Sequence, residues 1–260
     1  LDAAELYRNT GGNPFFVTEV LAAGGDSLPQ TVQDAVLARV ARLGPRARRV
    51  VDAVAIVPNG VDVALLEALS PDAADGLEEC LASGVLATSP GGVSFRHELA
   101  RLAVEVSLPP TRRVALHRTA LVALSQPAVG APDPTLLAHH AEAAGDTDAV
   151  LRFAVEAALL AARAGSHREA AAQYQRALRF SAHAGAKQRA DLLSQLSAEA
   201  YMFGEYPVAV DARRRAIDLF RELGDRVSEG DAWRAMSANL RCQGRVQEGW
   251  EAGTAAVELL

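Results

Sequence analysis

A glycine recurs every 19 or 20 residues through the second half of the chain. Each of these glycines follows an amphipathic stretch of roughly 16 residues, a length typical of a helix. Glycine ends helices readily because it adopts the left-handed backbone conformation without steric cost. Two helices with their turns therefore form one structural unit, and the period is about 40 residues. The glycines are Gly145, Gly165, Gly185, Gly204, Gly224 and Gly244.

Small residues stand at fixed distances from the glycine in the second helix of each unit. Ala170 follows Gly165, and Ala209 follows Gly204, at the same distance of five residues. Small side chains let neighbouring helices approach closely, as stacked helix pairs require. Over residues 147–260 this pattern resembles the tetratricopeptide repeat (TPR), with a period longer than its usual length of about 34 residues. The ninth position after the glycine changes most: it is Tyr174, then Arg213, then Gly253.

The first half of the chain has the pattern of short helices and one hairpin. Ser89-Pro90-Gly91-Gly92 joins two short extended runs, residues 85–88 and 93–95. Helices followed by a hairpin are the order of elements in a winged helix. The predicted fold class is therefore mainly α, a winged-helix unit with a small β-hairpin followed by a TPR-like α-solenoid. The predicted helices span residues 31–43, 46–57, 62–69, 70–83 (with Ser70 as N-cap), 97–107 and 110–124.

His97 stands where the second extended run changes into a helix. The start of a helix exposes unpaired N–H groups and the positive end of the helix dipole. An imidazole at this point can join those groups in holding an anion. The alternative is that His97 caps the helix or packs against it, and the residue by itself favours this alternative.

The charge of the chain argues against nucleic-acid binding. There are 26 basic residues against 32 acidic residues, a formal net charge of −6. Because Lys and Arg contacts with phosphates supply much of the affinity for DNA, the acidic third helix of the winged helix predicts no direct DNA binding. Its acids are Asp72, Asp75, Glu78 and Glu79. The basic stretch of Arg39, Arg42, Arg46, Arg48 and Arg49 is interpreted as solvated or paired with acids.

Cysteine usage and hydropathy indicate a cytoplasmic protein. Cys80 and Cys242 lie far apart in sequence and form neither a disulfide framework nor a zinc motif. No apolar run reaches the roughly 18 residues of a membrane span, so we expect no membrane partner. The chain starts without methionine, carries no recognisable targeting leader and stops within a helical pattern. We therefore expect it to be a piece of a longer protein.

Catalytic patterns are missing from this sequence. The loop Gly-x-x-x-x-Gly-Lys-Ser/Thr is absent, and Lys187 is the only lysine. Arg101 stands where a zinc-protease helix that begins at His97 needs its second histidine. His139 and His140 are adjacent and are expected to point to different faces of their helix, so no metal site is predicted. We expect that this chain is not an enzyme and that it holds no cofactor by itself.

Three motifs of the first half carry a family resemblance. They are Gly11–Val17 (GGNPFFV), Leu28–Val32 (LPQTV) with Ala38–Leu43 (ARVARL), and Phe95–Leu99 (FRHEL). They resemble the back half of the nucleotide-switch module in STAND ATPases, and most closely the large ATP-binding LuxR-family (MalT-like) transcriptional regulators. The resemblance covers residues 1 to about 125 and, with the repeats, nearly the whole chain.

The resemblance implies an upstream P-loop domain, a winged helix used for switching, a repeat arm and a C-terminal helix-turn-helix. ADP or ATP with Mg would bind to the full-length protein. The resemblance places Pro14 at a proline that packs against adenine and His97 at a histidine that contacts the β-phosphate. Glu98 stands where related switches often have aspartate and keeps its charge. The implied domains are 1–28, the end of the ATPase lid; 29–126, the winged helix with the helices that follow it; 127–134, a linker; and 135–260, the TPR-like repeats.

Two other classes of protein stay open at this point: a multidomain cyclase or protein kinase with the same module, and a plain repeat scaffold. In each case we expect a protein or small-molecule effector to bind the repeat arm. The expected surface is formed by the first helix of each pair, about residues 147–164, 190–203 and 228–241. Self-association in the active state is also expected. Candidate anchors are Tyr201, Trp233 and Arg234, although core packing is favoured for Trp233.

Overall fold

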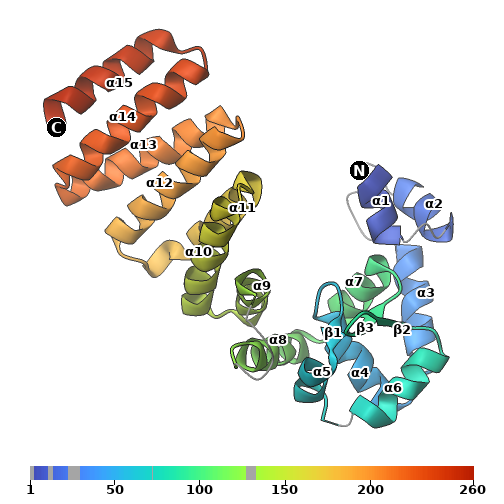
Figure 1. The fold of residues 1–260 in the computed structure, drawn as a ribbon. Helices are drawn as coiled ribbons and strands as arrows, with labels where there is room; N and C mark the ends of the chain where they lie inside the picture. The colour runs from blue at the N-terminus through green and yellow to red at the C-terminus, as the bar shows by residue number, and fades with distance from the viewer. Residues whose placement is uncertain (1–2, 11–13, 23–29, 72, 127–132) are drawn as a thin grey trace. The chain divides into compact units, whose positions relative to one another are not determined.

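The computed structural model describes residues 3–10, 14–22, 30–71, 73–126 and 133–260 (Figure 1). The chain consists of two compact units, residues 1–132 and residues 133–260, and each is described by itself. The described residues are mainly helical and contain one small antiparallel sheet in the first unit. The predicted fold class is thus confirmed.

Helix α4 (Pro45–Ala55) lies at the centre of the first unit, and its residues Val50, Val51 and Val54 are fully buried. It packs against α6 (Ala73–Ala82), and the two backbones come close at Gly76. A Cβ at Gly76 would lie 2.7 Å from the carbonyl of Arg46, so a larger residue would push the helices apart. The other helices before the sheet are α1 (Ala3–Thr10), α2 (Pro14–Ala22), α3 (Gln30–Val40) and α5 (Val63–Leu69).

The sheet of the first unit has three short strands in the order β1-β3-β2, all antiparallel. The predicted hairpin is confirmed as β2 (Leu86–Ser89) and β3 (Gly92–Phe95). Strand β1 (Val61–Asp62), which pairs with the start of β3, was not predicted from the sequence. Gly92 is required there because a Cβ would collide with the carbonyl of Val61. Asp62 also caps α5, since its carboxylate accepts a hydrogen bond of 2.7 Å from the N–H of Leu65.

The prediction that Ser70 caps the next helix is wrong. Ser70 closes α5 instead, because its N–H donates to the carbonyl of Leu66 at 2.8 Å. The carbonyl of Ser70 accepts from the N–H of Ala73, and α6 begins only at Ala73. Asp72, which was expected in the first turn, lies outside the described residues.

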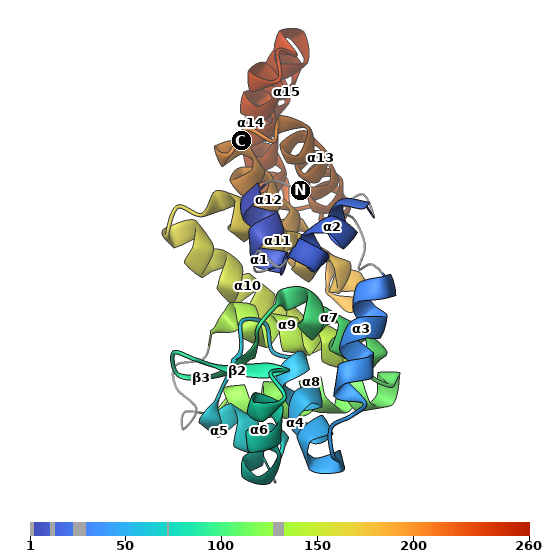
Figure 2. The same cartoon turned by 90° about the vertical axis from the view of Figure 1, so that its right-hand side faces the viewer.

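Two helices complete the first unit: α7 (Glu98–Ser107) and α8 (Pro110–Leu124). Helix α7 lies beside α3, as both views show (Figures 1 and 2). A small apolar cluster joins Val20 of α2, Val32 of α3 and Leu99 of α7. These contacts fix the beginning of α7, where His97 is located.

The second unit is a stack of helices in which each helix packs on the next along the chain (Figure 1). Pro134, the last residue of the predicted linker, is already in the first of these helices, and residues 127–132 lie outside the described residues. No described helix has both the length and the apolar character that membrane crossing requires. The elements are α9 (Pro134–Ala144), α10 (Thr147–Arg163), α11 (His167–Arg179), the 3-10 helix η2 (Ser181–His183), α12 (Ala186–Met202), α13 (Tyr206–Leu223), α14 (Arg226–Cys242) and α15 (Val246–Leu259).

Five of the six recurring glycines have φ between 68° and 85°, the left-handed conformation expected for a helix-ending turn. Gly185 is the exception. It has φ of −60° and precedes α12 as its N-cap, because η2 makes the turn at this point of the stack. The repeat is also visible in hydrogen bonds: Ser197 donates to the carbonyl of Ala209, and Ser237 donates to the carbonyl of Gly249.

Candidate functional site

His97 occupies the junction between β3 and α7. Its backbone is extended, with φ −138° and ψ 133°, and it is the N-cap residue of α7. The imidazole makes no capping hydrogen bond to the helix, whereas the His97 carbonyl accepts from the N–H groups of Ala100 and Arg101. The helix is therefore started by the backbone of His97, and its half-buried side chain is not used as a cap.

The side chain of His97 lines a cavity of about 220 Å³ in the first unit. Three elements form its wall: one side of α3, the turn before β2, and the junction that leads into α7. The lining residues are Ala35, Val36, Arg39, Gly84, Val85, Arg96, His97 and Ala100.

Two arginines give this cavity a positive character. Arg39 and Arg96 both line it, and both are exposed. Burial lowers the pKa of His97, and the charge of Arg96 lowers it further. The imidazole is therefore neutral at neutral pH and can donate one N–H. A cavity with this lining attracts an anion, and an anion beside His97 would raise its pKa.

Pro14, the second predicted site residue, lies apart from this cavity. It is the exposed first residue of α2 and does not belong to the cavity lining. Helix α2 reaches the α3 and α7 helices through Val20, near its other end. The structure therefore does not bring Pro14 and His97 together in one cavity.

A buried ion network that the sequence analysis missed holds α7 in place. Arg101 is 5% exposed and pairs with Glu98 at 2.7 Å and with Glu105 at 2.6 Å. It also donates to the carbonyl of Ala55 at the end of α4. Nε2 of His117 on α8 lies 3.6 Å from Glu105. The i, i+3 and i+4 spacing of these charges on α7 is the sequence signal that could have indicated the network.

The network strongly favours the ionised form of Glu105. Burial raises the pKa of this carboxyl, but hydrogen bonding to His117 and the Arg101 charge lower it more, to about 2. Because Arg101 reaches the carbonyl of Ala55, the pairing connects α7 to the central helix of the unit. The network thus positions the helix that begins next to His97.

Two acids of α6 bind other residues of the first unit. Asp75 forms an ion pair of 2.5 Å with Arg46, and Glu79 accepts a hydrogen bond from the N–H of Gly44. Arg48 donates to backbone carbonyls of the preceding turn. The interpretation as an arginine paired with an acid is therefore supported for Arg46, whereas Arg48 binds backbone carbonyls and Arg39 lines the cavity of His97.

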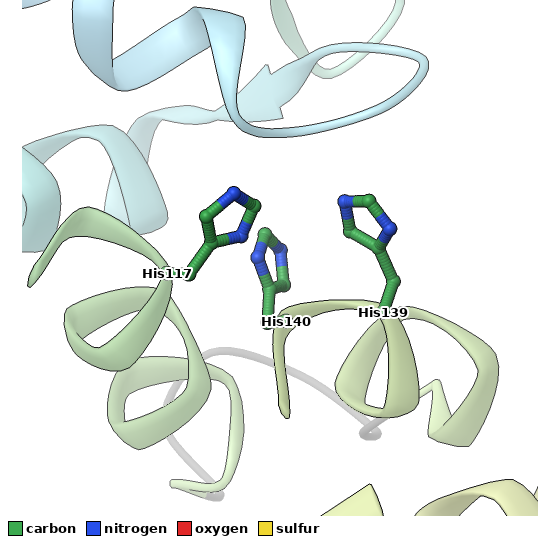
Figure 3. A group of neighbouring side chains, drawn as sticks. All are labelled: His117, His139 and His140. Atoms are coloured by element: carbon green, nitrogen blue, oxygen red, sulfur yellow. The ribbon is translucent and has the colours of Figure 1, made fainter. Parts of the chain in front are cut away.

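Three histidines of α8 and α9 are labelled in Figure 3. His117 belongs to the first unit and is fully buried. His139 and His140 belong to the second unit, and their rings meet edge to face with centroids 5.1 Å apart. The expectation that these two neighbours point to different faces is therefore wrong, because their side chains turn toward each other.

The candidate anchors of the second unit lie on two different surfaces. Trp233 lines a cavity of about 390 Å³ together with residues of α13 and α15, and its indole N–H donates to Glu229. Arg234 is exposed and lines another cavity of about 390 Å³ with Ser237 and Arg241 of the same helix. The ring of Tyr201 lies 5.8 Å from the ring of Tyr206. Trp233 thus faces the second helices of the pairs.

Comparisons with known proteins do not assign the chain to a family. No family model and no curated protein matches it. Among solved structures it is similar to the crystal structure of BtubC (BKLC) from P. vanneervenii, with 14% identity and a TM-score of 0.39. That match covers 86% of this chain and 91% of the other.

Proposed function

We propose that this chain is the regulatory and partner-binding middle section of a cytoplasmic, nucleotide-switched STAND ATPase, in a LuxR-family transcriptional regulator. The observation that carries the proposal is the cavity of His97. A neutral imidazole and two arginines line it at the junction that leads into α7, and the positive end of the helix dipole at such a junction favours an anion. Arginine binds phosphate oxygens through strong, charge-assisted hydrogen bonds, and the imidazole N–H can add a further hydrogen bond.

The size of the cavity fits a phosphate group better than a whole nucleotide. Its volume of about 220 Å³ is below the range of roughly 300–1,000 Å³ that is usual for small-molecule sites. The nucleotide would therefore be held mainly by another domain, which presents its β-phosphate to His97. This division of roles agrees with the absence of a phosphate-binding loop from the sequence.

The ion network of Arg101 gives the proposed contact a mechanical consequence. A phosphate bound at His97 would hold the start of α7, and Arg101 joins α7 to the end of α4. Binding and release of the phosphate would then move the first unit as one body. The resemblance to the switch module supplies the identity of the nucleotide, and the stacked helices of the second unit would bind the effector or protein partner.

The proposal is tested by comparing ADP and AMP binding to the full-length protein, because only ADP has a β-phosphate. A hydrogen bond to a charged phosphate contributes roughly 1.5 to 3 kcal/mol. The variant His97→Ala should therefore bind ADP about ten- to a hundredfold more weakly in calorimetry, with little change for AMP. The matched control is His183→Ala, which removes an exposed histidine of the second unit. An equal loss for both nucleotides, or no loss for ADP, would reject the proposal.

A further inference from the structure

Arg213 on α13 is a buried cation without an acidic partner. Arg213 is 8% exposed. Its guanidinium forms no ion pair within residues 133–260, all of which the structure describes. Burial lowers the pKa of Arg213 to about 10, and the nearby charge of Arg234 lowers it as well. A buried guanidinium normally has a carboxylate beside it, because an uncompensated charge is costly to bury.

The hydrogen bonds of Arg213 leave part of the guanidinium open. Nε donates to the hydroxyl of Ser197 at 3.2 Å, and Nη2 donates to the carbonyl of Ser194 at 3.0 Å. Nη1 donates to no atom of the described residues, although a guanidinium has five N–H groups. The hydroxyl of Ser194 is also buried and has no hydrogen-bond partner among the described residues. Nη1 of Arg213 and the Ser194 hydroxyl therefore both lack a hydrogen-bond partner among the described residues.

Packing of the repeat does not require an arginine here. In the preceding helix pair the equivalent position is Tyr174, which is 1% exposed. In the following pair it is Gly253. Neither neighbouring pair has a charged residue at this position, so the stacking of the helices does not by itself explain the charge of Arg213.

The surroundings of Arg213 belong to the surface on which we expect the effector. Arg213 donates to Ser194 and Ser197 of α12, and Asn239 of α14 donates to the same Ser197 hydroxyl at 3.0 Å. The guanidinium therefore lies near the first helices of two neighbouring pairs, where the charge of Arg234 on α14 acts on it. Arg234 is exposed and also lines the cavity with Ser237 and Arg241. Its nearest acid is Asp231, at 3.4 Å on the same helix, and both groups are exposed.

We propose that Arg213, with Arg234, binds a carboxylate side chain of an acidic peptide segment on the partner protein. The open edge of a planar guanidinium fits a carboxylate through two parallel hydrogen bonds. Arg213 is only 8% exposed, and a flat carboxylate enters a narrow opening more easily than a tetrahedral phosphate. This inference rests on the partner-binding role proposed above and names the chemistry of the ligand.

The test uses the complete 260-residue chain and a short peptide of alternating Glu and Ala residues. The control peptide carries Gln in place of Glu. The Glu peptide should bind measurably in calorimetry and should bind at least about tenfold more weakly to Arg213→Met, which keeps the length of the side chain without its charge. Arg215→Met is the matched control, because Arg215 is an exposed arginine of the same helix that pairs with Asp211 at 3.6 Å.

Melting curves of each variant check the fold. Replacement of a buried charge by an apolar residue of similar volume is often neutral or stabilising, so Arg213→Met should melt no lower than the wild type. If it melts lower, Arg213→Lys serves as the second variant, because it keeps the charge without the planar fork and should still weaken the binding of the Glu peptide.

Equal binding of the Glu and Gln peptides, or unchanged binding by both Arg213 variants, would overturn the inference. Competition by inorganic phosphate as strong as that of the Glu peptide would reject the assignment to a carboxylate. None of these results involves the His97 cavity, so the ADP experiment stands or fails separately.

Discussion

Burial decides what each charged or titratable side chain of this chain can do. His97 is half-buried beside Arg96, and both conditions keep its imidazole neutral. Arg101 is buried with two acids and serves the structure of α7, whereas Arg213 is buried with none. The sequence shows all three residues but not their burial, so only His97, at a recognisable junction, was predicted as a site. Arg101 and Arg213 became informative through their surroundings.

The ion network makes the first unit sensitive to acid. The folded-state pKa of Glu105 is about 2, below its ordinary value of 4.5. The stability contributed by Glu105 is therefore complete above pH 4.5 and is lost as the pH falls toward 2. The difference corresponds to about 3 kcal/mol. We expect Glu105→Gln to unfold at lower urea at pH 7, followed by circular dichroism, and to show a weaker dependence on pH between 5 and 2.

The exposed Glu67 provides the control for that experiment. Glu67→Gln should retain both the stability of the wild type and its loss in acid, because surface substitutions of this kind usually change stability by less than about 0.5 kcal/mol. Equal acid sensitivity in Glu105→Gln and the wild type would show that ionised Glu105 does not contribute this stability.

At the scale of elements, periodic patterns were predicted well and local interruptions were not. The helix stack follows from glycines whose φ is positive, and the hairpin follows from Ser89-Pro90-Gly91-Gly92. Strand β1 has only two residues and therefore no alternation to recognise. Ser70 was assigned to the wrong helix because Ser-Pro is typical of a helix start, whereas here its N–H closes α5. Strand pairing between distant segments decides β1, and backbone hydrogen bonds decide to which helix Ser70 belongs.

The two kinds of glycine in the stack give a prediction of their own. Gly224 has φ of 68°, whereas Gly185 has φ of −60°, and a Cβ would meet no atom within 4 Å at either position. Only the backbone conformation thus distinguishes them. Gly224→Ala should lower the free energy of unfolding by about 1–2 kcal/mol, the cost of a left-handed residue with a side chain. Gly185→Ala should cost less, and equal losses in urea titrations would contradict the distinction.

At the scale of the whole molecule, each unit has a separate part in the proposed switch. The first unit carries the cavity of His97 and the network that holds α7, and the second carries the helix stack with Arg213. The order of the two architectures was predictable from periodicity, because turns at regular spacing begin at Gly145. The positive lining of the cavity was not, since Arg39 and Arg96 are 57 positions apart in sequence and meet only through the packing of α3 against α7.

The rate of ADP release from the full-length protein tests the role of His97 most directly. If His97 clamps the β-phosphate, His97→Ala should release ADP about ten- to a hundredfold faster than the wild type. Its melting temperature without nucleotide should change little, because α7 is started by the backbone carbonyl of His97, which the substitution keeps. A rate of release equal to that of the wild type, together with a lower melting temperature, would contradict the clamp and assign His97 to packing.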